Sequence, residues 1–237
     1  MKRVALVTGA SKGIGKVIAI KLAELGFNIM IVGRNKDQLT LVKDEIERRN
    51  VSCAITSADL SESNAPAYVV NETIRMLGKL DVLINNAGLA GSMPVSETSV
   101  ELWDLLFKVN ARAPYFICKE AVPFLKASHN PVIINIGSVV DFKGYINQSA
   151  YASSKHALAG FTKVLAKEVQ NDGIKVHLIS PGGVNTEMVS EMRPDINTDE
   201  LIKPEEIAEL VEFLVTRKGK GTIDHFYIRR QSGLAFD

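Results

Sequence analysis

Tyr151 and Lys155 lie four residues apart in the segment Y-A-S-S-K, and Ser138 ends the apolar run P-V-I-I-N-I-G-S further upstream. A four-residue step places two side chains on the same face of a helix, one turn apart. A tyrosine phenol has an ordinary pKa of about 10, and a positive charge beside it favours its anion. The Ser138 hydroxyl adds a neutral hydrogen-bond donor. These three groups together suit proton transfer to or from an oxygen whose carbon is being reduced or oxidised.

An isolated Y-x-x-x-K pair is more often a surface tyrosine and lysine on an ordinary helix, so other segments must support the catalytic interpretation. One of them is T-G-A-S-K-G-I-G, which follows the first apolar run and precedes a helical pattern. Glycines at such a turn let the backbone approach a pyrophosphate held at the N-terminus of the helix. The candidate cofactor contacts in this segment are Gly9, Ser11, Lys12, Gly13, Ile14 and Gly15.

The end of the second apolar run tests which cofactor the chain prefers. Sheets that bind NAD place an Asp or Glu here for the hydroxyls of the adenine ribose. This chain has Gly33-Arg34-Asn35 instead, and its next acid is Asp37. Arg34 is placed to pair with a 2′-phosphate, and Lys12 supplies a second cation. We therefore expect NADP rather than NAD, with Arg34 and Asn35 among its contacts.

Short β-branched runs alternate with longer amphipathic segments along the whole chain. The expected strands are Val4–Thr8, Asn28–Gly33, Val51–Ser57, Val82–Asn85, Val132–Ile136, Ile174–Ile179 and Ile223–Ile228. The expected helices are Ile14–Leu25, Asp37–Arg49, Asn64–Leu77, Val100–Leu125, Ser149–Asn171 and Pro204–Thr216. This alternation predicts an α/β fold, a doubly wound parallel sheet of the Rossmann type with about seven strands and helices on both faces. We expect a single domain over residues 1–237, with a short substrate flap near 186–203.

Composition narrows the possible partners and the compartment. The chain has 237 residues, 46% hydrophobic and 23% charged, with a net charge of +1. Without a basic excess, we expect binding to neither nucleic acid nor a membrane surface. Cys53 and Cys118 both lie in apolar contexts, which predicts buried thiols in a reducing compartment and no metal site. With no signal-peptide pattern and no membrane-length apolar stretch, we expect a cytoplasmic protein.

Taken together, the motifs resemble those of the classical short-chain dehydrogenases/reductases over nearly the whole chain. T-G-A-S-K-G-I-G, N-N-A-G, Asn110, Ser138, Y-A-S-S-K and P-G-G-V-N-T follow the family's order and approximate spacing. The resemblance implies that Tyr151 is the general acid in reduction and the base in oxidation. It implies that Lys155 lowers the pKa of Tyr151 and binds the nicotinamide ribose. Ser138 would orient the carbonyl, and Asn110 would hold a water in a proton relay.

The same resemblance implies further cofactor contacts in three segments. They flank the adenine, lie beside the adenine ribose, and hold the carboxamide and pyrophosphate. In that order, the residues are Asp59 and Leu60; Asn86, Ala87 and Gly88; and Pro181, Gly182, Val184 and Thr186.

The pattern is most similar to the 3-oxoacyl carrier-protein reductases, which use NADPH, but two features depart from it. Asp172 stands before Gly173, where those enzymes commonly present an arginine to an acidic carrier protein, and Y-I-R-R-Q-S-G replaces their V-N-G-G. We therefore expect an NADPH-dependent carbonyl reductase acting on a small molecule. Carrier-protein reduction is the alternative.

A non-catalytic NADPH-binding sensor is a third possibility, which the four intact catalytic positions disfavour. The resemblance also implies a homodimer or homotetramer. We expect a mostly apolar substrate pocket without a charged anchor, lined by Gly91–Pro94, the flap and the residues after Ser138. The residues expected after Ser138 are Val139, Val140, Tyr145 and Gln148.

Overall fold

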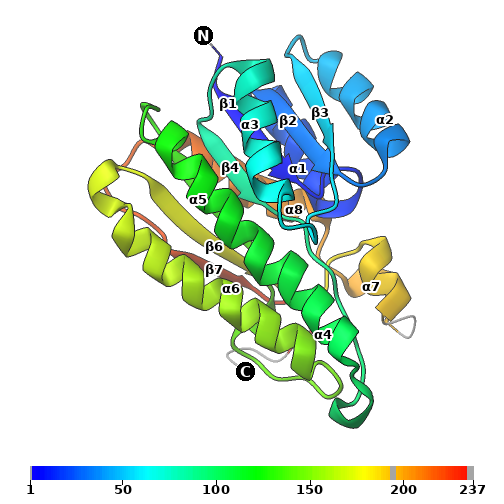
Figure 1. The fold of residues 1–237 in the computed structure, drawn as a ribbon. Helices are drawn as coiled ribbons and strands as arrows, with labels where there is room; N and C mark the ends of the chain where they lie inside the picture. The colour runs from blue at the N-terminus through cyan, green and yellow to red at the C-terminus, as the bar shows by residue number, and fades with distance from the viewer. Residues whose placement is uncertain (1, 193–195, 234–237) are drawn as a thin grey trace.

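The computed structural model of the chain describes residues 2–192 and 196–233. A seven-stranded parallel sheet in the order β3-β2-β1-β4-β5-β6-β7 forms its centre (Figure 1). The strands are β1 Val4–Thr8, β2 Asn28–Gly33, β3 Cys53–Ser57, β4 Val82–Asn85, β5 Val132–Ile136, β6 Lys175–Pro181 and β7 His225–Ile228. The predicted doubly wound α/β sheet is therefore confirmed.

Strands β1, β4 and β5 are buried along their whole length, which explains why their sequences are apolar at nearly every position. β3 begins at Cys53, two residues later than predicted. The backbone N–H of Ser52 donates to the side chain of Asn28 at 3.0 Å rather than to the backbone of β2. β6 extends through Pro181, which pairs in register with Ile228 at the end of β7.

Helices cover both faces of the sheet (Figure 1). They are α1 Gly13–Glu24, α2 Lys36–Glu47, α3 Ala65–Leu77, α4 Val100–Phe107, α5 Ala113–Leu125, α6 Ser149–Glu168, α7 Glu187–Met192 and α8 Pro204–Thr216. One apolar cluster packs α1, α2 and α8 against the sheet, and a second packs α3, α5 and α6 against the other face. The central strands β1, β4 and β5 are therefore shielded from water on both sides, whereas the edge strand β7 stays partly exposed.

The predicted helix Val100–Leu125 is helical over its whole length, but it is not α-helical throughout. Between α4 and α5, residues Lys108–Arg112 form a wider π-helical turn, in which the N–H of Ala113 donates to the carbonyl of Lys108. The following Pro114 has no N–H with which to continue the ordinary i→i−4 pattern. Such turns are often found at functional sites, and this one carries the buried Asn110.

The expected flap over 186–203 contains more regular structure than its sequence suggested. It includes α7, which stands apart at the side of the sheet (Figure 1), and a 3-10 turn at Thr198–Glu200. Val184 bridges to Ile202, so the two ends of the segment lie together. Pro194, also expected in this flap, lies outside the described residues.

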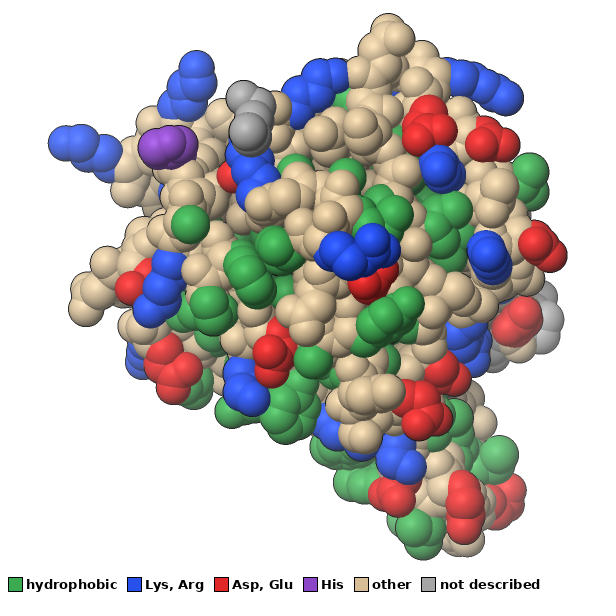
Figure 2. Space-filling view, turned by 45° about the horizontal axis from the view of Figure 1, so that its top comes forward, with side chains coloured by type: hydrophobic (Ala, Val, Ile, Leu, Met, Phe, Trp, Pro, Cys, Tyr) green, Lys and Arg blue, Asp and Glu red, His purple; other side chains and the backbone are tan. Residues whose placement is uncertain are grey.

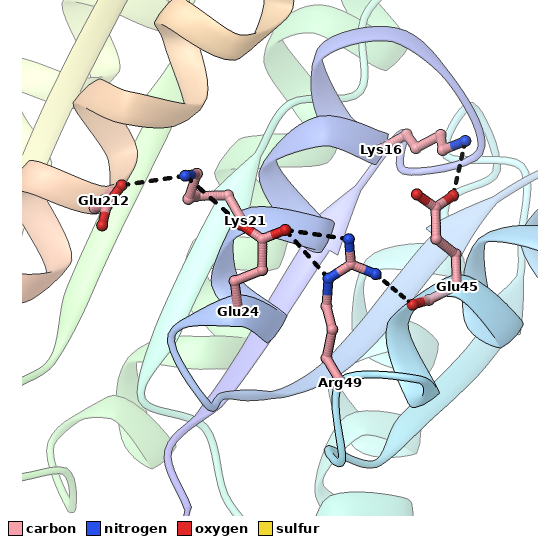
Figure 3. A network of polar contacts seen from close by, with 6 residues as sticks. All are labelled: Lys16, Lys21, Glu24, Glu45, Arg49 and Glu212. Carbon is pink, nitrogen blue, oxygen red and sulfur yellow. Dashed lines mark hydrogen bonds and ion pairs between the residues drawn. The ribbon is translucent and has the colours of Figure 1, made fainter.

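Exposed ion pairs hold α1 between its two neighbouring helices (Figure 3). Lys21 of α1 lies 3.5 Å from Glu212 of α8, and Glu24 of α1 lies 3.1 Å from Arg49, just after α2. The residues drawn are Lys16, Lys21, Glu24, Glu45, Arg49 and Glu212. Exposed pairs of this kind each contribute little to stability. On the face drawn in Figure 2, basic side chains are interspersed with acidic ones, as the near-neutral composition leads one to expect.

Candidate active site

The carboxyl ends of β1 and β4 meet where the winding of the sheet reverses, which is where open α/β sheets bind ligands. The Thr8 hydroxyl accepts hydrogen bonds from the backbone N–H groups of Asn86 and Ala87, both at 3.0 Å. The Asn86 side chain donates back to the carbonyl oxygens of Thr8, at 2.9 Å, and Gly9, at 3.1 Å. These bonds fix the N-N-A-G loop against the glycine-rich turn.

The glycines of this turn are required by its geometry. Gly9 and Gly13 have φ of +65° and +56°, a backbone conformation that favours glycine. A Cβ on Gly9 would lie 2.8 Å from the Cα of Ala87, and one on Gly15 would lie 2.3 Å from the carbonyl oxygen of Gly9. Gly9 and Gly13 thus shape the turn, whereas Gly15 lets α1 approach it closely.

A cavity of about 450 Å³ runs over this turn and along the carboxyl ends of the strands. Most of the predicted cofactor contacts line it, together with three of the four predicted catalytic residues. These lining residues are Gly9, Ser11, Lys12, Gly13, Ile14, Arg34, Asp59, Leu60, Asn86, Ala87, Gly88, Ser138, Tyr151, Lys155, Pro181, Gly182, Val184 and Thr186. The size and position of this cavity fit a dinucleotide. The glycine-rich turn leaves room for it, because a Cβ on Gly9 would clash with the neighbouring backbone.

Three predicted site residues, Gly15, Asn35 and Asn110, are not among the residues that line this cavity. Asn35 instead caps α2, where its side chain accepts a hydrogen bond from the N–H of Gln38 at 3.0 Å. Helix capping is a frequent role for asparagine. The expectation that Asn35 is a cofactor contact therefore has no support in the geometry.

The two predicted phosphate-binding cations differ in their surroundings. Arg34 is exposed at the edge of the cavity, close enough to Asp59 to help lower the pKa of that carboxylate. The largest influence on Asp59 is the hydrogen bond from the backbone N–H of Ser61, at 2.8 Å. Lys12 forms an ion pair with Glu187 of α7. This contact, which joins the glycine-rich turn to the flap, was not predicted from the sequence.

Tyr151 and Lys155 are both buried, one turn apart on α6, as their spacing predicted. The Lys155 ammonium donates a hydrogen bond to the carbonyl oxygen of Ile136 at 3.0 Å, which anchors it at the end of β5. Ser138 follows β5 in extended backbone with φ of −168° and begins the short turn Val139–Asp141. The structure thus brings the predicted trio together at one end of the cavity.

Burial dominates the titration of this trio. It raises the pKa of Tyr151, while the nearby Ser138 hydroxyl acts in the opposite direction and the Asp141 carboxylate raises the pKa further. Burial lowers the pKa of Lys155 to about 8, and Asp141 partly opposes this effect. Desolvation of the phenolate is the largest of these influences on Tyr151. That Lys155 lowers the pKa of Tyr151 stays a prediction, because the net shift does not isolate its contribution.

Asn110 lies behind the trio with its carboxamide fully engaged by protein groups. Its Oδ1 accepts from the N–H of Leu89, and its Nδ2 donates to the Leu89 carbonyl, both at 2.8 Å. The same Nδ2 donates to Ser154 of α6 at 2.9 Å. Asn110 therefore positions the loop after β4 against the helix that carries Tyr151 and Lys155. Its predicted water relay stays a prediction.

Asp141 is a buried carboxylate that was not among the predicted site residues. Its Oδ2 accepts from the backbone N–H of Ser138 at 3.3 Å and from the hydroxyl of Ser180, and Nε2 of His225 lies 2.7 Å from that hydroxyl. The signal was present in S-V-V-D, since a serine followed three residues later by an acid forms a capping box.

A second cavity of about 200 Å³ shares five lining residues with the first: Ser138, Tyr151, Gly182, Met188 and Val189. The predicted substrate-pocket residues Val139, Val140, Tyr145 and Gln148 line it, as do Met188, Val189 and Ile196 from the flap segment. Gly91–Pro94 does not line it. Lys143, Arg229 and Arg230 do, which supplies candidates for the charged anchor that the sequence did not indicate.

Comparison with known proteins agrees with this geometry. The family model described as short chain dehydrogenase matches residues 3–197. The chain belongs to the short-chain dehydrogenase family. Carbonyl reductase family member 4 of Xenopus laevis is 34% identical over 220 residues, covering 91% of this chain and 92% of that protein.

Two further comparisons place the chain within the family. A 3-oxoacyl-[acyl-carrier-protein] reductase of Staphylococcus epidermidis is 29% identical over 230 residues, covering 93% of this chain and 94% of that protein. The crystal structure of a metagenomic short-chain oxidoreductase in complex with NADP superposes with a TM-score of 0.84. It has 30% identity and covers 98% of each chain. This short-chain dehydrogenase is thus an oxidoreductase that acts on CH–OH groups with a nicotinamide cofactor.

Within the part of the chain that the structure describes, no cluster of three or more His, Cys, Asp or Glu side chains is arranged to hold a metal ion. None of the helices in that part is both long and apolar enough to cross a bilayer.

Proposed function

We propose that this protein is an NADPH-dependent carbonyl reductase that converts a small ketone or aldehyde to the alcohol. The observation that carries the proposal is that Ser138 and Tyr151 line both cavities. A carbonyl group held between them faces the dinucleotide site on one side. The rest of its molecule occupies the smaller cavity on the other.

The protein's part in the reaction is to place the carbonyl and move one proton. The nicotinamide supplies the hydride when bound. The Ser138 hydroxyl donates a hydrogen bond to the carbonyl oxygen and stabilises negative charge developing there. The Tyr151 hydroxyl donates its proton to the same oxygen. Its raised pKa keeps it protonated, which suits a general acid in the reducing direction.

Lys155 and Asn110 support this exchange. With a pKa of about 8, the Lys155 ammonium is mostly protonated at neutral pH. One of its N–H groups is directed at Ile136, which leaves two donors for a ribose hydroxyl and the proton path. Asn110 keeps the loop after β4 in place through Leu89. We assign Asn110 a positioning role.

Arg34 and Lys12 favour NADPH over NADH. Arg34 lines the cavity at the end of β2, where the chain has no carboxylate for a ribose diol. A guanidinium binds a dianionic phosphate through paired hydrogen bonds. Lys12 reaches the phosphate only after leaving Glu187, so its contribution is the smaller of the two.

Reduction of a carrier-bound 3-oxoacyl group is the second candidate. Asp172 was expected to repel an acidic carrier protein, but it lies 3.0 Å from the ammonium of Lys126. This pairing weakens the repulsion, so the surface at Asp172 disfavours such a partner less than its sequence suggested. Comparing kcat/KM for a free 3-oxoacyl thioester and the same group on a carrier protein separates the two candidates. A large preference for the carrier-bound form would support the second.

The proposed assembly is a homodimer or homotetramer that packs through the faces of α5 and α6. Tyr115, Phe116 and Val164 are exposed there, and the ring of Tyr115 lies 4.8 Å from that of Phe161. Exposed apolar side chains of this size favour burial in an interface. Light scattering of the purified protein measures the assembly directly.

We also propose a cytoplasmic location. Its support is that Cys53 and Cys118 are both free and buried. Burial raises the pKa of each thiol to about 12, which makes them unreactive.

The proposed activity is tested by following deuterium from 4-deuterated NADPH into the products of a ketone and aldehyde panel. We expect deuterium on the carbinol carbon of at least one product, and no transfer by Tyr151→Phe. NADPH binding without deuterium transfer to any member of the panel would favour the non-catalytic sensor.

A further inference from the structure

The charged residues that line the smaller cavity are all positive. Of the residues that line it and that the structure describes, Lys143, Arg229 and Arg230 are cationic and none is Asp or Glu. The remaining walls are apolar or neutral, with Val139 and Val140 on one element and Tyr227 of β7 on another. A cavity that holds the reacting groups and carries unbalanced positive charge selects for anionic ligands.

The three cations are not equally available. Nη1 of Arg229 donates to the carbonyl oxygens of Arg230, Gln231 and Gly233 at 3.0, 3.3 and 2.8 Å. These bonds hold the turn after β7. The ammonium of Lys143 lies 5.6 Å from the centre of the Tyr227 ring, where a cation–π contact engages it.

Arg230 differs from both. It is half-buried, and no ion pair among the described residues includes it. Its Cδ lies 3.7 Å from the position that a Cβ on Gly183 would occupy, so its stem lies beside the loop after β6. Gly182 and Gly183 of that loop also line the cavity. A half-buried guanidinium that pairs with no carboxylate among the described residues is well suited to an oxyanion ligand.

We propose that the substrate of this enzyme carries a carboxylate or phosphate group in addition to its carbonyl, and that Arg230 binds this anionic group. The proposal rests on the proposed carbonyl reductase function. The volume of about 200 Å³ fits a small oxo acid or a small phosphorylated carbonyl compound. Arg229 contributes by holding the turn that presents Arg230.

The anionic group of the substrate contributes binding energy and takes no part in the reaction. The carbonyl carbon gains a hydride from NADPH, the carbonyl oxygen gains the proton of Tyr151, and NADP⁺ leaves with the alcohol. The charge on the distant oxyacid is the same before and after. Binding energy from this non-reacting group holds the carbonyl against Ser138 and Tyr151.

The kinetic test compares matched pairs of substrates. The first arm pairs oxo acids of three to seven carbons with their methyl esters, and the second pairs dihydroxyacetone phosphate with dihydroxyacetone. We expect kcat/KM of the wild type to favour the anionic member of at least one pair by about 10- to 100-fold, the range of a charge-assisted hydrogen bond. The preferred arm identifies a carboxylate or a phosphate as the anionic group.

Three variants locate the source of that preference. Arg230→Met keeps an unbranched apolar stem and removes the charge, and it should lower the anionic-to-neutral ratio about 10- to 100-fold. Arg230→Lys should restore part of the ratio. Lys220→Met removes an exposed cation outside the cavity and should leave the ratio unchanged. An equal ratio in wild type and Arg230→Met, with ketones turned over, would overturn the proposal while leaving the reductase function standing.

A binding measurement separates the two proposals if turnover is never detected. Calorimetry titrates the same oxo acids and dihydroxyacetone phosphate into the NADPH complex of Tyr151→Phe, with and without Arg230→Met. Binding that Arg230→Met weakens at least tenfold supports the anion site even where no carbonyl is reduced. Binding of equal strength in both backgrounds contradicts it.

Discussion

The carboxylate of Asp141 lies beneath the backbone of Ser138 and accepts its N–H at 3.3 Å. The same carboxylate accepts a hydrogen bond from the hydroxyl of Ser180, which lies 2.7 Å from Nε2 of His225. A buried negative charge thus supports the residue proposed to hold the substrate carbonyl. It also raises the pKa of both Tyr151 and Lys155.

Replacing this charge should move the pH dependence of the reaction. Burial is the main cause of the raised pKa of Tyr151, and Asp141 adds to it, so Asp141→Asn should lower that pKa. The pKa of Lys155, about 8 in the wild type, should fall as well. In alcohol oxidation Tyr151 acts as the base, so the rising limb of the pH–rate profile should shift to lower pH.

Asparagine retains an oxygen that can accept from the Ser138 N–H, so this variant tests charge more than shape. A lower rate with an unshifted profile would assign Asp141 a structural role only. A shift to higher pH would contradict the proposed electrostatic effect.

The cofactor preference should depend mainly on Arg34. We expect NADPH to be favoured over NADH by at least tenfold in kcat/KM, and Arg34→Ala to remove most of this preference. Gly33→Asp combined with Arg34→Ala should reverse it. A Cβ on Gly33 would have its nearest contacts at 3.4 Å, from Leu39 and Ser11, which is ordinary van der Waals contact.

Salt provides the control, because exposed phosphate contacts weaken as ionic strength rises. The NADPH preference of the wild type should shrink with added salt. Equal KM values for NADPH and NADH in the wild type would refute the proposal that Arg34 binds the 2′-phosphate.

The ion pair between Lys12 and Glu187 should compete with NADPH for the lysine. Glu187→Gln should therefore tighten NADPH binding by about two- to fivefold, since exposed ion pairs are weak. NADH, which lacks the 2′-phosphate, should bind as before. Fluorescence titrations of both cofactors measure this, and a parallel gain for NADH would point to a general effect of the flap instead.

Asp81 is expected to be a stability residue. Its buried carboxylate accepts from the N–H of Val4 at 2.8 Å and from Ser128 at 2.6 Å, and it pairs with Lys79 at 2.9 Å. Burial acts to raise its pKa, but these partners outweigh burial and the pKa is lowered. Asp81→Ala should reduce the free energy of unfolding by about 2–4 kcal/mol, the usual cost of breaking a buried charged network.

The sign of the pH effect follows from the lowered pKa. The carboxylate stabilises the fold above its unfolded pKa of about 4, and the benefit is lost as pH falls through the folded pKa. The stability difference between wild type and Asp81→Ala, measured by urea unfolding, should therefore narrow below about pH 4. A difference that grows at low pH would contradict this account.

The elements that local sequence dictates were predicted closely. The strands β1, β2, β4 and β5 have the expected bounds, because each is a short apolar run in a fully covered parallel sheet. The spacing of Tyr151 and Lys155 placed both on α6 correctly. The π-helical turn around Asn110 was missed because the apolar periodicity continues through it, while Pro114 alters the hydrogen bonds.

Long-range contacts explain the other misses. Lys12 pairs with Glu187 of the flap, 175 positions away in the sequence. Arg230 lines the smaller cavity because β7 pairs with β6. Neither contact has a local sequence signature. Asp141 differs, since its capping box was visible in the sequence.

The central claim is that Tyr151 donates the proton, and it is tested most directly by turnover and NADPH affinity measured together in Tyr151→Phe. General acid catalysis contributes about 10²- to 10⁴-fold. Turnover should fall at least 10²-fold while the Kd for NADPH stays within about threefold of the wild type. Lys155→Ala, the control, should weaken both, because the lysine is proposed to hold the ribose as well. Turnover by Tyr151→Phe within a few-fold of the wild type would contradict the account.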